Sequence, residues 1–522
     1  MLTGSPTTVR KGATWAELYD QCCSIAPEAF DADRVRNLWG GQWRRAGKPA
    51  EAVTPVDRSP IAGPPMLNLD QAQEAVAASA AEHREWTKVG LDERRQRVAR
   101  AVDQLEANRE LLALLLVWEI GKPYRQALTS ADRTAGGVRW YLDEIDRMLI
   151  GRQPLPGPVS NIASWNYPLS VLAHAMLVQL LAGNAIIAKT PTDGGLCALT
   201  LATALMRREE LPVTLISGSG GRLSPALVLS DEIGCLAFVG GRDVGGQIAS
   251  QLVQTDKRHM LEQEGLNAWG IWEFSDWPTL AKHLKKGFEF AKQRCTAYPR
   301  YVVQRSLFDQ FLAMYLDVAR SLRFGHPLAV EQPDDQPPEL DFGPVINEAK
   351  ARELKYELDF AITLGAAPIY RSSLEDGWFL PGQDTSAYVP PVALLNPPGA
   401  STLSHAEPFG PVDTIVLVDS RAELLAAMNA SNGCLVASIA SDDEQFARGL
   451  AEELHAFKVG INEPRSRGDK AEPFGGRGPS WKGAFVGGEY LVHAVTEGPP
   501  DERLYGNFAD YQRHPPVYAP PM

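Results

Sequence analysis

The 522-residue chain has little that would tie it to a membrane or a nucleic acid. Acidic residues outnumber basic ones by 64 to 51, which gives a formal net charge of −13, and no long Lys/Arg run offsets it. A protein of that charge repels phosphate backbones and anionic lipid, so we expect no nucleic-acid and no membrane partner. The most apolar stretch, 171–188, carries His174, Gln179 and Asn184, polar groups that a bilayer would leave unsatisfied. It predicts a buried helix, turn and strand instead.

Cysteine is scarce as well. The six cysteines show no metal-ligand spacing, and there are only nine histidines, so we predict no metal site. Residues 1–15 lack the apolar core of a secretory signal. These features favour a reducing, cytoplasmic location, where a thiol stays free for chemistry.

Short apolar strands alternate with helical segments along most of the chain. Such alternation predicts parallel sheets with right-handed crossovers, here two α/β domains in series. The first series is strand 185–188, helix 195–208, strands 213–216 and 235–239, and helix 244–253; the second is helix 280–292, strand 301–304, and helices 307–322 and 348–363. Outside these series we expect helices at 15–23, from Asn68 or Asp70 to 81, at 92–120 and at 132–148, and a last strand near 490–496 that runs into Pro499-Pro500.

Cys295 is the first candidate for chemistry. The small neighbours Thr296 and Ala297 leave its sulfur approachable, and the adjacent Arg294 favours the reactive thiolate. An isolated cysteine is equally consistent with a buried structural role.

Two further segments carry polar groups suited to catalysis. Glu262 and Glu264 lie two apart in an extended segment and so share one face, where mutual repulsion raises one pKa towards that of a general base. The alternative is a solvated strand end. Asn166, between two aromatic residues and a proline, could donate to an oxyanion or simply form a turn.

A nucleotide site is the remaining candidate. The segment that begins at Gly218 lacks the last glycine of the G-x-G-x-x-G fingerprint, because Leu223 takes that position. Residues 238–245 pass from a strand through glycines into a helix, which suits a pyrophosphate at the helix N-terminus but also an ordinary βα turn.

Taken in order, these segments resemble the aldehyde dehydrogenase superfamily, NAD(P)-dependent enzymes that oxidise aldehydes to acids. The resemblance extends from about residue 37 to residue 497. The matching motifs are Ser164-Trp165-Asn166-Tyr167-Pro168, Gly183-Asn184 with Lys189, Phe238-Val239-Gly240 with Gly245, Glu262-Gln263-Glu264-Gly265, Gln293-Arg294-Cys295, Phe342-Gly343-Pro344, Glu407-Pro408-Phe409-Gly410 and Pro473-Phe474-Gly475.

The resemblance implies a role for each matched residue. Cys295 would attack the aldehyde to form a thiohemiacetal and then a thioester, Asn166 would hold the oxyanion, and Glu262 would activate the hydrolytic water. NAD or NADP would be the cofactor, Lys189 would contact the adenosine ribose, Glu407 the nicotinamide ribose, and Phe409 would pack near the nicotinamide. The other expected cofactor-binding residues are Trp165, Thr192, Gly218, Phe238, Gly240, Gly245 and Glu264.

Four departures from the family pattern alter these expectations. Glu264 replaces a usual glycine, and Ala175 replaces a frequent lysine. Thr192 stands where many NAD-preferring members carry Glu, and a neutral residue there does not repel the 2′-phosphate of NADP. The 25 residues from Trp140 to Trp165 are too few for the usual oligomerisation hairpin, so we expect a homodimer in place of the common tetramer.

The resemblance also divides the chain. We expect two Rossmann-like parallel-sheet domains, one cofactor-binding (37–135 and 155–262) and one catalytic (263–455), flanked by an extension (1–36) and a tail (501–522). Residues 136–154 and 484–500 form a reduced oligomerisation element. The expected activity is oxidation of a small-molecule aldehyde, and the aromatic residues near the site favour an apolar or aromatic one. The alternatives are acyl transfer to coenzyme A or another acceptor, and a catalytically weak binding or scaffold protein.

Overall fold

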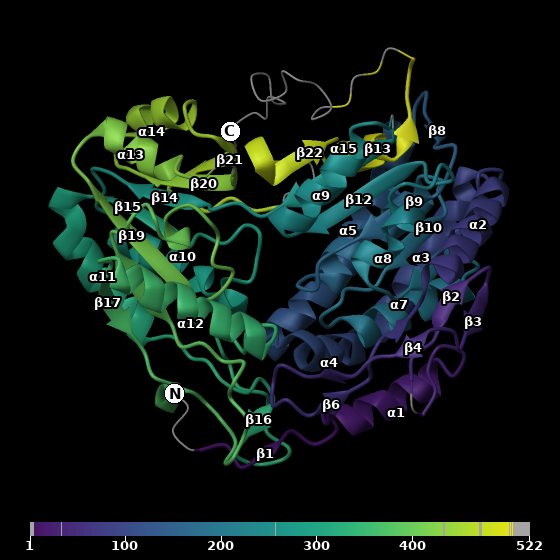
Figure 1. The fold of residues 1–522 in the computed structure, drawn as a ribbon, viewed down its shortest axis with the longest axis horizontal. Coiled ribbons are helices and arrows are strands. Elements are labelled where there is room, and N and C mark those ends of the chain that lie inside the picture. Colours follow the sequence, from purple (N-terminus) through teal and green to yellow (C-terminus); the bar gives the residue numbers. More distant parts are fainter. Residues whose placement is uncertain are drawn as a thin grey trace.

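The computed structural model describes residues 5–32, 34–255, 257–431, 434–468, 472–500, 502 and 504. In this part of the chain two large, mostly parallel sheets form two halves, each with helices packed on its sheet (Figure 1). This confirms the expected pair of Rossmann-like α/β domains. Among the described residues, no helix combines the length and the apolar character needed to cross a bilayer.

The first sheet has eight strands in the described part. Its five central strands, β13 to β11, are parallel, while β22, β2 and β3 are antiparallel at the edges. Because β9 lies between β10 and β12, the strand order reverses there, and ligands of such sheets bind outside the carboxyl ends at that point. The strands, in spatial order, are β22 (Trp481–Gly483), β13 (Arg258–Gln263), β12 (Cys235–Gly240), β9 (Val159–Ile162), β10 (Ile186–Lys189), β11 (Val213–Ile216), β2 (Asn37–Trp39) and β3 (Gln42–Arg44).

The second sheet has seven strands in the described part, all parallel except the edge strand β17. Its strands, in spatial order, are β17 (Ala367–Arg371), β18 (Val392–Leu395), β19 (Val412–Val418), β15 (Arg300–Gln304), β14 (Ala268–Ile271), β20 (Cys434–Ala440) and β21 (Ala456–Ile461). The helices and turns of this half are α10 (Trp277–Gly287), η2 (Glu289–Lys292), η3 (Arg305–Leu307), α11 (Phe308–Arg320), α12 (Glu348–Thr363), η4 (Leu374–Asp376), η5 (Thr402–Ser404), α13 (Arg421–Met428) and α14 (Glu444–Ala451).

Three helices of the first half differ from the prediction. The helix expected at 132–148 already begins at Tyr124, helix Gly220–Leu227 was not expected, and two helices replace the one expected at 92–120. The chain breaks at Asn108, whose side chain donates to the carbonyl of Gln104 at 2.9 Å and so ends the first helix. The break separates an amphipathic helix from one that is buried almost all round. The helices are α2 (Leu69–Trp86), α3 (Leu91–Ala107), α4 (Arg109–Ile120), α5 (Tyr124–Met148), η1 (Pro168–Ala173), α6 (His174–Leu181), α7 (Leu196–Arg208), α8 (Gly220–Leu227) and α9 (Arg242–Leu252).

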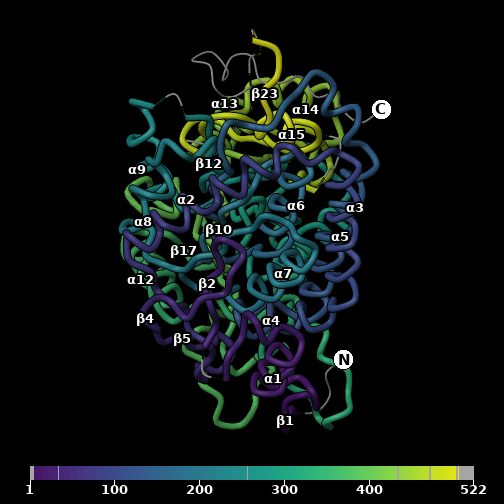
Figure 2. The backbone as a smooth tube through the Cα atoms, turned by 90° about the vertical axis from the view of Figure 1, so that its right-hand side faces the viewer, coloured from purple at the N-terminus to yellow at the C-terminus, as the bar shows by residue number. Residues whose placement is uncertain are grey.

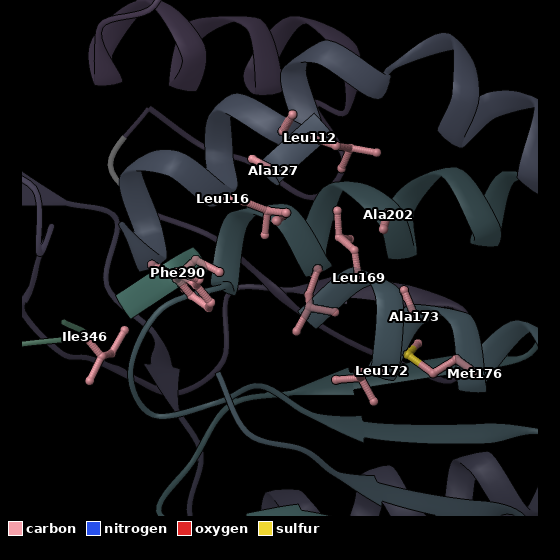
Figure 3. Close-up of a cluster of buried hydrophobic side chains, with 14 of the residues drawn as sticks. Leu112, Leu116, Ala127, Leu169, Leu172, Ala173, Met176, Ala202, Phe290 and Ile346 are labelled. Carbon is pink, nitrogen blue, oxygen red and sulfur yellow. The ribbon is translucent and has the colours of Figure 1, made fainter. Parts of the chain in front are cut away.

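The largest core joins these helices to the catalytic half. Figure 3 shows Leu112 and Leu116 of α4, Leu169 of η1 and Met176 of α6 gathered with Phe290, which comes from the segment before Cys295. These side chains are at most 2% exposed. At roughly 25 cal/mol per Å² of apolar surface, this burial stabilises the contact between the two halves.

The expected helix 280–292 is wrong at its end. Helix α10 stops at Gly287, and Phe290, Ala291 and Lys292 follow with φ of 57°, 52° and 56°. Left-handed backbone costs a non-glycine residue about 1–2 kcal/mol, so tertiary contacts must hold this segment. The turn ends the helix and directs the chain towards Cys295.

The expected last strand is also wrong. Residues Glu489–Ala494 form helix α15, and only β23 (Thr496–Glu497) is extended, paired antiparallel with β8 (Gln153–Pro154). Gly488, with φ of 50°, precedes the helix and turns the chain into it. Because this ladder is only two residues long, residues 150–154 and 496–497 offer little strand edge for pairing with another subunit.

The start of the chain lies across both halves. Strand β1 (Thr8–Val9) pairs antiparallel with β16 (Ala329–Val330) of the catalytic half, and α1 (Trp15–Ile25) packs on α4 of the other half. Figure 2 shows this purple segment at the end of the molecule opposite the yellow α15. The remaining small elements are β4 (Lys48–Pro49), β5 (Ala52–Val53), β6 (Pro60–Ile61), β7 (Pro65–Met66) and η6 (Gly478–Ser480).

Candidate active site

A cavity of about 250 Å³ lies between the carboxyl ends of β9, β12 and β13 and the catalytic half. It brings together Cys295, Glu262 and Asn166, three groups far apart in the sequence. Its full lining is Ala163, Ser164, Trp165, Asn166, Tyr167, Val171, Val239, Gly240, Gly241, Glu262, Gln263, Glu264, Cys295, Ile346, Lys350, Glu407, Phe409 and Arg467.

Cys295 lies on the loop between η2 and β15, and its partly exposed thiol opens onto this cavity. The buried amide of Asn267 donates to the carbonyls of Cys295 at 2.8 Å and Ala297 at 2.7 Å. The Asn267 oxygen accepts from the backbone of Val436 at 3.1 Å, so the loop is tied to β20. No sequence signal pointed to Asn267, because its partners are 28 or more residues away.

A buried ion pair lies beneath the same loop. Lys292, 1% exposed, donates to the carboxylate of Asp413 at 2.6 Å and to the carbonyl of Tyr298 at 3.0 Å. Tyr315 donates to the other oxygen of Asp413 at 2.8 Å. These bonds hold Lys292 in its left-handed conformation and so fix the loop that carries Cys295.

Asn166 follows β9 and is 5% exposed. Ser164 donates to its side-chain oxygen at 2.6 Å, and one N–H of its amide donates to the carbonyl of Gln293 at 3.0 Å. A primary amide has two N–H donors, so one remains for a ligand in the cavity. The side chain is thus oriented as the oxyanion role requires.

Lys122 supports Asn166 from behind. Its ammonium donates to the carbonyl of Asn166 at 3.2 Å and to Ser130 Oγ at 3.1 Å. It also faces the rings of Tyr167 at 4.1 Å and Phe290 at 4.4 Å, a cation–π arrangement. Burial lowers the pKa of Lys122 well below its usual range. Sequence patterns gave no sign of this residue.

Glu262 is the second-last residue of β13, is 2% exposed, and forms an ion pair with Arg467. The acceptor is Oε2, and Oε1 has no hydrogen-bond partner among the described residues. Glu262 and Arg467 also line a second cavity, of about 40 Å³, behind the first. An arginine on the general-base candidate was not foreseen, because Arg467 comes from a loop 205 residues further along the chain.

The thiol of Cys295 is held in its protonated form. Burial, and then the negative charge of Glu262, raise the pKa of Cys295 well above its usual range, while Arg467 opposes the rise. Since the thiolate is the nucleophile, the free enzyme carries little of it at neutral pH.

We therefore expect alkylation of Cys295 by iodoacetamide to accelerate as pH rises beyond 9. Glu262→Gln removes a negative charge and lowers the thiol pKa, so alkylation at pH 8 becomes faster than in the wild type. Mass spectrometry of the modified peptide measures the rate. Glu289→Gln, on the exposed side of the same segment, is the control. Equal rates in wild type and Glu262→Gln would contradict the assigned electrostatics.

The lining of the cavity also contains an acidic pair. Glu264 and Glu407 both line it, and Glu264 Oε2 lies 3.9 Å from where a Cβ on Gly241 would stand. Burial and then the charge of Glu264 raise the pKa of Glu407 well above its usual range. Both oxygens of Glu407 are buried without a hydrogen-bond partner among the described residues. They can accept from ligand hydroxyls, as a ribose would require.

The other predicted cofactor residues divide into two groups. Trp165, Gly240 and Phe409 line the 250 Å³ cavity, where the Trp165 and Phe409 rings meet edge to face at 5.9 Å. The second group does not line it. Lys189, whose pKa burial lowers to about 8, ends β10; Thr192 is exposed beyond it; Gly218 lies between β11 and α8; Phe238 lies within β12 and Gly245 in α9.

Two of the glycines serve packing instead of ligand approach. A Cβ on Gly245 would come within 2.5 Å of the Gln263 side chain, and one on Gly240 within 2.6 Å of the Phe238 ring. By contrast, a Cβ on Gly220 or Gly221, at the start of α8, would meet nothing closer than 4.0 Å. The open backbone near Lys189 is therefore at Gly220 and Gly221, and these residues were not predicted.

Comparison with known proteins agrees with this geometry. The model of the aldehyde dehydrogenase family matches residues 43–498. The chain is 25% identical over 488 residues to 3,6-anhydro-alpha-L-galactose dehydrogenase of Vibrio sp. (strain EJY3), covering 90% of this chain and 98% of that protein. It is 28% identical over 474 residues to the NADP/NAD-dependent aldehyde dehydrogenase PuuC of Escherichia coli (strain K12), covering 86% and 90% of the two chains.

Solved structures share the fold. The NADP-dependent glyceraldehyde-3-phosphate dehydrogenase of Bacillus halodurans C-125, complexed with NADP, superposes with a TM-score of 0.80 at 25% identity, covering 89% of this chain and 98% of that one. Betaine aldehyde dehydrogenase of Staphylococcus aureus, in complex with NAD+, gives 0.80 at 21% identity, covering 94% and 99%. The family match over most of the sequence, together with the cavity that joins Cys295, Asn166 and Glu262, leads to one conclusion: the chain belongs to the aldehyde dehydrogenase family.

Proposed function

We propose that Cys295, Asn166 and Glu262 carry out the activity of the family, the NAD(P)-dependent oxidation of an aldehyde to a carboxylic acid. The observation that supports this most directly is the shared cavity, which exposes a thiol, an amide N–H and a carboxylate to the same space. A nucleophile, an oxyanion donor and a base within one cavity are what acyl chemistry requires.

The thiol of Cys295 gives its proton to solvent water, and its sulfur adds to the aldehyde carbon while the C=O π electrons move to the oxygen, giving a negatively charged thiohemiacetal. The N–H of Asn166 that is not bonded to Gln293, with the backbone N–H of Cys295, stabilises the negative oxygen; a lost oxyanion donor typically costs about 10²–10³ in rate. NAD(P), which Lys189 and Glu407 would hold, would supply the acceptor for the hydride that leaves the thiohemiacetal carbon. Glu262 then takes a proton from a water molecule while the oxygen of that water adds to the Cys295 thioester. The Cys295 thiolate leaves, and the carboxylic acid forms.

The described residues fit a dinucleotide. Lys189 and the open backbone of Gly220 and Gly221 suit the adenosine and phosphate end, and the unpartnered oxygens of Glu407 suit a ribose. Glu264 is the exception, because its carboxylate faces Gly241. Burial raises the pKa of Glu264, because removal from water disfavours its charged form. Among the proteins named above, PuuC is named NADP/NAD-dependent and the two solved structures are complexes with NADP and NAD+, so either nucleotide is proposed here.

The exposed Thr192, three residues beyond Lys189, favours acceptance of NADP because it carries no charge to repel a 2′-phosphate. Thr192→Glu should therefore lower kcat/KM for NADP by about 10- to 100-fold and change that for NAD by less than about threefold. Initial rates with both nucleotides measure this, and Thr192→Gln is the neutral control. Equal losses with both nucleotides would place Thr192 away from the ribose.

Turnover of an aldehyde panel with NAD and NADP tests the proposed function, with the acid product identified by mass spectrometry. Acid without added acceptor supports hydrolysis through Glu262. Product formed only with coenzyme A would favour acyl transfer. Absence of both turnover and NAD(P)H fluorescence change would favour the catalytically weak binding protein.

We also propose a cytoplasmic homodimer. The support is the two-residue ladder of β8 with β23, which offers a partner subunit little strand edge for the larger assembly. Helix α15 takes the place of the expected strand, so the argument now depends on β8 and β23 alone. A tetramer by light scattering would overturn it.

A further inference from the structure

Arg467 brings a positive charge to the catalytic end of the cavity. Only two of the residues that line the cavity are cationic, Lys350 and Arg467. Lys350 forms an ion pair with Glu353 at 2.8 Å, whereas Arg467 forms one with Glu262. The rest of the lining near Cys295 is mainly apolar or aromatic. An aldehyde that reaches the sulfur therefore meets this guanidinium.

The Arg467 side chain is held in place, but few of its N–H donors form hydrogen bonds within the described part of the chain. Its guanidinium lies 5.3 Å from the ring centroid of Phe474, and it is 27% exposed. The loop before it is anchored, because the backbone N–H of Arg465 donates to Tyr298 at 2.9 Å. A guanidinium carries five N–H donors, and within the described part of the chain Arg467 uses one of them, to Glu262 Oε2.

This ion pair conflicts with the role of Glu262 as a base. A carboxylate that is 2% exposed needs a countercharge, but one tied to a guanidinium is less free to turn towards a water at Cys295. A second carboxylate near Arg467 would compete for the same donors, since the guanidinium fork matches carboxylate geometry.

Starting from the proposed function, we propose that Arg467 binds the carboxylate of a short aldehyde acid and that this binding releases Glu262 to act on the thioester. The substrate's anion must lie a few bonds from its aldehyde carbon, because Arg467, Glu262 and Cys295 line the same cavity and Arg467 contacts Glu262. A neutral aldehyde enters the same aromatic-lined space, but the ion pair between Arg467 and Glu262 then stays intact. The substrate class is thus a carboxylated aldehyde in preference to the purely apolar one that the aromatic residues suggested.

Matched aldehydes test the preference. Succinic semialdehyde is compared with butanal, and 4-carboxybenzaldehyde with 4-methylbenzaldehyde, using kcat/KM. We expect the wild type to favour the carboxylated member of each pair by about 10- to 100-fold, the range of a charge-assisted hydrogen bond, and Arg467→Met to bring both ratios below about threefold. Arg320→Met removes an exposed charge that does not line the cavity and should leave the ratios unchanged. Equal ratios in wild type and Arg467→Met would overturn the proposal.

A binding experiment separates this inference from the proposed activity. The probe is succinamate, an unreactive analogue with one carboxylate, and butyramide is its neutral counterpart; calorimetry measures both. Arg467→Met should lose succinamate binding, whereas Glu262→Gln should bind it about tenfold more tightly because the competing carboxylate is gone. If these affinities behave as expected while no aldehyde is oxidised, the anion site stands and the proposed function fails. If aldehydes are oxidised but both variants bind succinamate like the wild type, the inference fails alone.

Discussion

Replacing Cys295 with alanine should abolish NAD(P)H formation from any aldehyde while leaving nucleotide binding intact. The sulfur that the structure opens onto the cavity is the only group there able to form the thioester, and losing a catalytic nucleophile typically costs on the order of 10³-fold or more. Lys189 and Glu407, the residues assigned to the nucleotide, are untouched by this change. Initial rates and fluorescence titration with NADPH measure the two effects.

Cys23→Ala is the matched control. Cys23 is also partly exposed, but it lies in α1 and does not line the cavity. It should retain wild-type turnover. Activity in Cys295→Ala within tenfold of wild type would remove the thiol from the mechanism, and the remaining candidates would have to explain oxidation without a covalent intermediate.

The second large effect concerns stability. Asp413→Leu leaves Lys292 buried without a countercharge, and breaking a buried pair in this way costs about 3–5 kcal/mol. Because Lys292 also holds the carbonyl of Tyr298 and the left-handed turn, the loop carrying Cys295 should loosen too. The expected result is a lower midpoint of thermal unfolding together with a lower kcat.

The double variant Lys292→Met with Asp413→Leu should recover much of the stability, since a buried ion pair replaced by apolar groups is often nearly neutral. Asp419→Asn is the control for an ion pair outside the core: Arg305 and Asp419 are both more than half exposed, and their loss should cost less than about 1 kcal/mol. A midpoint in Asp413→Leu equal to that of Asp419→Asn would contradict the assigned role.

The sequence was informative where local pattern decides structure. The alternation of apolar strands and helices predicted both sheets, and Val213–Ile216 and Glu348–Thr363 have the expected bounds. The order of the motifs predicted that Cys295, Glu262 and Asn166 share one site, and the cavity contains all three. These features depend on short-range periodicity and on a resemblance that spans most of the chain.

What the sequence could not provide depends on distant contacts. The left-handed run Phe290–Lys292 looks helical by composition, but the bonds of Lys292 to Tyr298 and to Asp413, 121 residues away, hold its conformation. Arg467 stood within a loop with no charge pattern, and its importance comes from Glu262 on another sheet. Residues 490–496 read equally well as helix or strand by composition, and the turn at Gly488 decides for the helix.

Strand β22 has a consequence for how the protein is made. It pairs antiparallel with β13, Trp481 opposite Glu262, so the strand that carries the general-base candidate has no neighbour on that side until residue 483 has been synthesised. During translation, nearly the whole polypeptide must leave the ribosome before this sheet is closed. Until then β13 presents an open edge, a known route to aggregation, so production of soluble enzyme should benefit from slow synthesis or from chaperones.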